Sequence, residues 1–159
     1  MQCKNGNFMN EIISLLKDPE YHPYFLLFLA TICGGALGTE RQSAGHKEAG
    51  RRTLALVSLG SCLFSIMPMM MGIPDPWRVA GQVVTGIGFI GGGVLIKDKD
   101  NFVRGLTTAA TIWVSAAIGI AFSADKIIFG IFCTILTFLI LKLKTEPMDY
   151  FKNKKIKNV

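Results

Sequence analysis

Charged residues are scarce in this chain of 159 residues, at 18% of the total, whereas about a quarter is usual in soluble domains. Hydrophobic residues make up 50% of the chain. The charged residues are also unevenly divided, with 11 acidic and 17 basic side chains and a formal net charge of +6. This composition argues against a soluble globular domain and is typical of a membrane protein.

Side chains that commonly perform catalysis or bind metals are few. The two histidines, His22 and His46, have no recognisable nucleophile or carboxylate partner in the sequence, so no enzymatic activity is expected. Four scattered cysteines, at positions 3, 33, 62 and 133, lack metal-ligand spacing and predict neither a disulfide nor a zinc site. Residues 1–23 lack the succession of basic, apolar and small residues that marks a cleavable signal peptide. No cofactor is predicted.

Apolar stretches recur five times, each close to the length of about 20 residues that crosses a bilayer. The windows are residues 24–38, 53–71, 79–96, 106–122 and 127–143. They predict an all-α integral membrane protein, a bundle of about five transmembrane helices. The predicted organisation is an N-terminal segment over residues 1–23 that could hold an interfacial helix, a transmembrane domain over 24–143 and a basic tail over 144–159.

Basic residues gather in every second gap between these windows. They are Arg41, Lys47, Arg51 and Arg52 after the first window, Lys97, Lys99 and Arg104 after the third, and six lysines around the end of the fifth. Because basic residues are enriched on the cytoplasmic side, the N-terminus is predicted outside and the C-terminus in the cytoplasm. The positive charge therefore indicates membrane topology, with the lipid bilayer as partner, and not a nucleic-acid surface.

Glycines are frequent inside the windows. Residues 86–91 read Gly-Ile-Gly-Phe-Ile-Gly and match a dinucleotide-binding fingerprint, but they lie in an apolar window without a preceding strand or a polar helix start. Small residues four apart instead allow membrane helices to pack closely. The predicted packing glycines are Gly34, Gly38, Gly86, Gly88, Gly91, Gly92 and Gly105. A broken helix lining a cavity is the alternative for residues 91–93.

Polar side chains near the ends of the windows form the candidate functional set, because polar groups in a membrane are costly. The set is Glu40, Arg41, Gln42, Arg51, Thr53, Arg78, Gln82, Arg104, Thr107 and Thr108. We expect them to form ion pairs and hydrogen bonds between helices, with Glu40 paired to Arg51 or Arg104. Glu40 is the only carboxylate expected to enter the membrane, and nearby arginines would repel a divalent cation, so no metal ligand is assigned.

Several of these segments resemble, in order, the sequence blocks of the MgtC/SapB family: residues 34–42, 49–53, 78–83, 86–93 and 103–111. The resemblance implies a multi-pass protein of the bacterial inner membrane, linked to magnesium homeostasis, survival at low magnesium and virulence. It implies a regulator that acts on other membrane complexes, such as the ATP synthase or cation transporters. A magnesium or other cation transporter or channel subunit is the alternative, and a homo-oligomer remains open.

Overall fold

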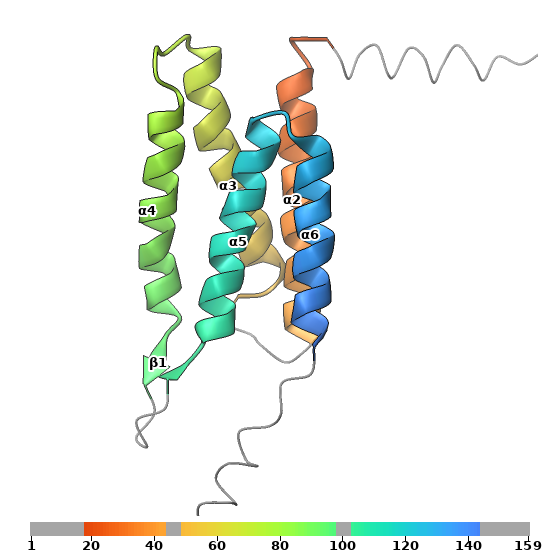
Figure 1. Cartoon of the computed structure of the whole chain (residues 1–159), viewed down its shortest axis with the longest axis vertical. Coiled ribbons are helices and arrows are strands. Elements are labelled where there is room, and N and C mark those ends of the chain that lie inside the picture. Colours follow the sequence, from red (N-terminus) through yellow and green to blue (C-terminus); the bar gives the residue numbers. More distant parts are fainter. Residues whose placement is uncertain (1–17, 44–48, 98–102, 144–159) are drawn as a thin grey trace, which may run out of the picture.

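The computed structural model describes residues 18–43, 49–97 and 103–143, and within them the chain forms five helices (Figure 1). Consecutive helices run in opposite directions. They are α2 (His22–Ser43), α3 (Arg51–Met70), α4 (Trp77–Gly93), α5 (Leu106–Ser123) and α6 (Ile127–Lys142). Each predicted window overlaps one helix, so the prediction of an all-helical bundle is confirmed for the described residues.

Three of the helices are long and apolar enough to cross a membrane. They are α2 with 22 residues, α3 with 20 and α5 with 18. The apolar helix α6 has only 16 residues, and α4 has 17, six of them glycine. Large apolar side chains such as Phe89 and Ile128 are 88% and 85% exposed, as expected of a surface that faces lipid. The chain is a membrane protein, and five crossings stay a prediction.

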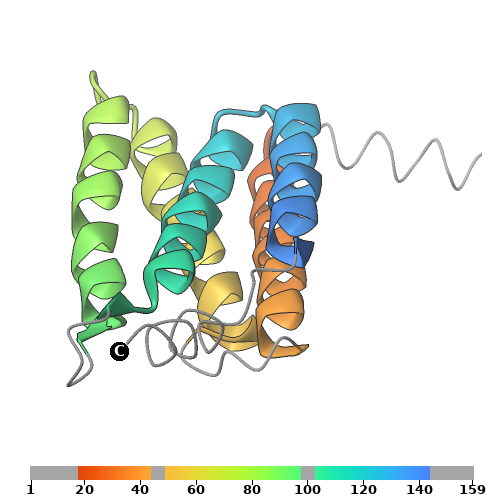
Figure 2. The ribbon, with the colours of Figure 1, turned by 60° about the horizontal axis from the view of Figure 1, so that its bottom comes forward.

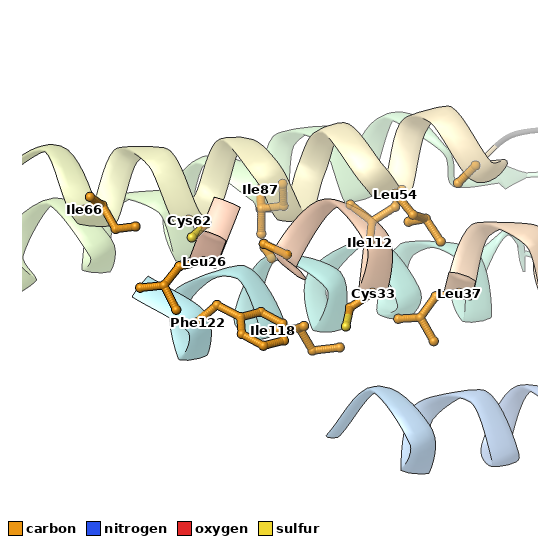
Figure 3. Packing of buried hydrophobic residues seen from close by; sticks show 13 residues of the cluster. Leu26, Cys33, Leu37, Leu54, Cys62, Ile66, Ile87, Ile112, Ile118 and Phe122 are labelled. Atoms are coloured by element: carbon orange, nitrogen blue, oxygen red, sulfur yellow. The ribbon is translucent and has the colours of Figure 1, made fainter. Parts of the chain in front are cut away.

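The core lies where α2, α3 and α5 meet. Figure 3 shows side chains from these helices converging, and those of Leu37, Leu54, Ile112 and Phe122 are fully buried. The two remaining helices lie on either side of this centre, with α4 against α5 and α3 and with α6 against α2 and α5 (Figure 2). The outer helices therefore leave much of their surface uncovered by the described chain.

A short antiparallel hairpin joins α4 to α5. Strand β1 (Ile96–Lys97) pairs with β2 (Val103–Arg104), with Ile96 opposite Arg104. This corrects the third predicted window, which extended a helix to residue 96. The helix instead ends at Gly93, after three consecutive glycines that disfavour helix through their backbone freedom.

The two ends of the bundle differ in charge. We call the end where α2, α4 and α6 finish the basic end; it lies at the bottom of Figure 1. It holds Arg41, Arg51, Arg52, Arg104 and Lys142, with Glu40 as its described acidic residue. The opposite end holds Asp18, Glu20, Asp75 and Asp125 together with Arg78 and Lys126. The predicted orientation would place the basic end in the cytoplasm.

Candidate functional site

A buried arginine marks the basic end of the bundle. Arg41, in the last turn of α2, is only 4% exposed, and its Nη2 donates a hydrogen bond of 2.5 Å to Oγ1 of Thr108. Thr108 lies in the first turn of α5 and is 2% exposed. The contact joins two helices that are far apart in sequence.

Two glycines of α2 bring this end against α3. A Cβ built on Gly34 would lie 2.7 Å from Cβ of Ser58 and would overlap the carbonyl oxygen of Leu54. A Cβ on Gly38 would lie 2.7 Å from the backbone nitrogen of Arg51. The α2–α3 crossing therefore depends on the absence of a side chain at both positions, which fixes how Glu40 and Arg41 are presented one half-turn later.

Glu40 is half-buried beside Arg41 in sequence. Its Oε2 has no contact with solvent and no hydrogen-bond partner in the structure. Among the described residues, no basic nitrogen lies within 4.0 Å of its carboxylate. The ion pair predicted with Arg51 or Arg104 is therefore not formed here. Both of those arginines are exposed.

The remaining members of the predicted set fall into three places. At the basic end, Gln42 is exposed, and its Oε1 lies 3.5 Å from a Cβ built on Gly50, so it reaches across the α2–α3 connection. Thr107 is exposed at the start of α5. Thr53 and Gln82 line a cavity between α3 and α4, and Arg78 is exposed at the opposite end. The structure thus brings together Arg41 and Thr108 but separates Arg78 from them.

The cavity between α3 and α4 has a volume of about 650 Å³. We call it the α3–α4 groove. Its walls are formed mainly by apolar side chains, such as Val57 and Phe64 of α3 and Val83 and Ile90 of α4. The groove is a second candidate site. The sequence analysis selected Thr53 and Gln82 but did not predict a cavity between these helices.

Buried serines form a polar seam that sequence reasoning missed. Ser58, Ser61 and Ser65 of α3 are buried, as is Ser115 of α5. Ser115 Oγ donates a 2.9 Å hydrogen bond to the carbonyl oxygen of Leu54 and so ties α5 to α3. The available signal was the helical spacing of three serines inside an apolar window, which places them on one face.

A polar contact at the opposite end was also missed. His22 Nε2 and Asp125 Oδ1 lie 2.9 Å apart, which connects the start of α2 to the turn between α5 and α6. Asp125 has a φ of 58°, a left-handed conformation that residues other than glycine, asparagine and aspartate rarely adopt. No sequence spacing links residues so far apart along the chain.

The predicted packing glycines behave differently from one another. Gly91 is buried, and its built Cβ would make ordinary contact with Ala109 at 3.7 Å. Gly105 has a φ of +90° in the turn before α5 and a Cβ there would overlap the Val94 carbonyl oxygen, so it serves a turn and not a helix crossing. Apart from the adjoining residues and backbone of their own helix, no atom of the described chain lies within 4 Å of a Cβ built on Gly86, Gly88 or Gly92. Their predicted packing role is not seen within one chain, because Gly86 borders the open α3–α4 groove and Gly88 and Gly92 are exposed.

The closest glycine contact in α5 was not predicted. A Cβ built on Gly119 would overlap the carbonyl oxygen of Ser58 and would lie 3.1 Å from the backbone nitrogen of Cys62.

In the part of the chain that the structure describes, no group of three histidine, cysteine or acidic side chains is placed to hold a metal ion. Cys33, Cys62 and Cys133 are free thiols.

Comparisons with known proteins agree with the resemblance described above. The sequence model of the MgtC family matches residues 27–149. The protein named "Putative magnesium transporter YhiD" of Escherichia coli K12 is 45% identical over 127 residues, 74% of this chain and 58% of that protein. Protein MgtC of Brucella abortus strain 2308 is 41% identical over 122 residues, 76% of this chain and 50% of its own length.

Protein MgtC of Salmonella typhimurium strain 14028s is 48% identical over 99 residues, 62% of this chain and 42% of that protein. The chain thus spans about half the length of the curated relatives it matches. No solved structure matches the chain.

Proposed function

The chain belongs to the MgtC family, and on that premise we propose that it is a multi-pass protein of the bacterial inner membrane that regulates magnesium homeostasis. In this proposal it acts on other membrane complexes, such as the ATP synthase or cation transporters, and supports survival at low magnesium and virulence. The magnesium link is supported by the name of the relative from Escherichia coli K12. The proposed orientation puts the basic end in the cytoplasm, and a homo-oligomer is compatible with it.

The observation that carries the choice of a regulator is the buried guanidinium of Arg41. It lies where α2 meets α5, hydrogen-bonded to Thr108, with Arg51 and Arg104 on adjoining elements. Positive charges at such a position repel a divalent cation, and the repulsion grows as the surroundings become less polar. An ion path through the basic end would therefore have to pass a fixed positive charge.

A cation transporter or channel subunit is the second candidate, and one observation favours it. The buried Oε2 of Glu40 accepts no hydrogen bond within the described structure. Magnesium prefers oxygen ligands and usually keeps several waters, so one carboxylate per chain could contribute to a site shared between copies. The two candidates differ in whether Glu40 is needed for ion movement.

Magnesium flux into sealed liposomes separates the two candidates. Liposomes that contain a magnesium-sensitive dye and the purified protein would be compared with protein-free liposomes, after size-exclusion chromatography shows that the protein is folded. The variant is Glu40→Gln, and the matched control is Asp75→Asn, which neutralises an exposed carboxylate at the opposite end. The proposal expects no flux above background. Flux that Glu40→Gln abolishes and Asp75→Asn retains would make the protein a transporter.

A regulator also needs a partner that can be captured in the native membrane. Photo-crosslinkable residues would replace Phe89 of α4 or Ile128 of α6, which face away from the bundle on different helices. The proposal expects a crosslink to another membrane protein from at least one of these faces. Crosslinks only to lipid or to a second copy from both faces would contradict it.

A further inference from the structure

The α3–α4 groove has two walls of similar character. One stripe of α3 and one stripe of α4 face each other across it. The side chains lie at helical spacing, such as Val57 and Phe64 on α3 and Val83 and Ile90 on α4. Gly60 and Gly86 also line the groove, and nothing lies within 4 Å of a Cβ built on either. These two glycines therefore leave the space that makes the groove.

Polar groups lie toward the ends of the groove. Ser61 belongs to the wall, but its hydroxyl already donates a 2.8 Å hydrogen bond to the carbonyl oxygen of Val57 in its own helix. Gln82 lies toward the opposite end, and Thr53 and Arg52 lie toward the basic end. The groove is thus apolar along its length and carries a positive charge at one mouth.

The charged mouth suits an anion. Arg52 is exposed, and neither an ion pair nor a hydrogen bond of its side chain is present among the described residues. It lies in the first turn of α3, whose N-cap residue Gly50 provides no side-chain cap for the first amides. A helix start favours negative charge, and a guanidinium binds a phosphate group through charge-assisted hydrogen bonds.

The length of the groove suits an acyl chain of one bilayer leaflet. Arg52 and Phe64 are twelve residues apart on α3, which corresponds to about 18 Å. The length is close to one leaflet, since the hydrocarbon core measures about 30 Å in total.

We propose that the α3–α4 groove binds one anionic phospholipid, with its phosphate at Arg52 and an acyl chain lying between α3 and α4 as far as Phe64. The apolar walls match the chain, and the positive mouth matches the headgroup by charge. The lipid belongs to the leaflet next to the basic end. This site is independent of the proposed regulatory function, because it requires neither magnesium nor a protein partner.

Native mass spectrometry of the delipidated protein in neutral detergent tests the site. The probes are phosphatidylglycerol and phosphatidylcholine with identical acyl chains. Arg52→Gln removes the charge at the mouth, and Arg51→Gln is its matched control at an exposed neighbour that does not line the groove. Gly86→Leu fills the groove, and Gly88→Leu is its control, since Gly88 has equally open space but lies outside it.

The wild-type protein should bind one phosphatidylglycerol about fivefold more tightly than phosphatidylcholine, the effect of one basic residue at about 1 kcal/mol. Arg52→Gln should remove this preference, and Gly86→Leu should weaken binding of both lipids, while the two controls behave as the wild type. Equal effects of Arg51→Gln and Arg52→Gln, or unchanged lipid binding in Gly86→Leu, would overturn the proposal.

Two further outcomes would assign the groove to another occupant. Displacement of phosphatidylglycerol by inorganic phosphate would reduce the site to a surface anion contact. A Gly86→Leu variant that changes the oligomeric state but keeps its bound lipid would mean that a second copy fills the groove. Either result would contradict the lipid site, and neither depends on the outcome of the flux experiment.

Discussion

Replacing Gly119 with alanine is the sharpest test of the packing described above. The added Cβ would overlap the carbonyl oxygen of Ser58 and lie 3.1 Å from the backbone nitrogen of Cys62. Both atoms belong to the backbone of α3 and cannot move aside alone. Since carbon atoms pack best at about 3.5–4 Å, α3 and α5 must separate by on the order of 1 Å.

The cost of this separation can be estimated from its parts. Overpacking of this kind costs about 1–3 kcal/mol, and the nearby hydrogen bond from Ser115 to the Leu54 carbonyl oxygen would weaken, at about 0.5–1.5 kcal/mol. Alanine recovers about 0.5–1 kcal/mol, because glycine loses more backbone conformational entropy than alanine when the helix forms. The net expectation is that Gly119→Ala lowers the free energy of unfolding by about 2 kcal/mol.

Reversible unfolding in mixed micelles, with increasing fractions of a denaturing detergent, measures this change. The matched control is Gly88→Ala, at a helical glycine whose Cβ would meet nothing within 4 Å. It should be as stable as the wild type or more stable by up to about 1 kcal/mol. Equal stability of the two alanine variants would refute the contact between α3 and α5 on which the reasoning depends.

Three further predictions concern contacts at the two ends of the bundle. Thr108→Val should lower the free energy of unfolding by about 1–3 kcal/mol because it removes one acceptor of the buried Arg41 guanidinium, and Thr108→Ser should restore most of it. Asp125→Ala should lower the free energy of unfolding by about 1–2 kcal/mol, because alanine is strained in the left-handed conformation and the contact with His22 is lost. Asp125→Gly should lower it less, because glycine adopts that conformation without strain, and equal decreases in the two variants would argue against backbone strain. Gly105→Ala should lower expression and thermal stability more than Gly93→Ala, since only Gly105 has a positive φ; the reverse order in a fluorescence-detected size-exclusion assay would contradict this.

The helices could be predicted because apolar length and helix start and stop signals are local. All five windows overlap observed helices, and α5 begins at the predicted residue. The hairpin of β1 and β2 could not be predicted, since two-residue strands carry no periodic pattern and depend on where α4 stops. The number of membrane crossings also remains a prediction, because α4 and α6 are short.

The candidate site was predicted in composition but not in its pairings. Sequence reasoning selected both Arg41 and Thr108 but assigned the central contact to Glu40. Which of several arginines turns inward depends on the angle at which α2 crosses α3, and this angle is set by Gly34 and Gly38 together. The direction in which an arginine points therefore depends on tertiary packing and not on local sequence. The same holds for the seam that contains Ser58 and Ser115, because the sequence does not distinguish a small polar residue that faces lipid from one that faces a neighbouring helix.

The two kinds of glycine in this bundle imply two kinds of evolutionary constraint. At Gly34, Gly38 and Gly119, a substitution meets the chain's own backbone, so selection for folding alone is sufficient to keep these positions invariant. At Gly86 and Gly88 the chain itself would accept larger residues, so natural variants should drift there unless something outside the chain occupies the space. Invariance at those positions across related bacteria would therefore record the shape of a molecule that the protein meets in the membrane.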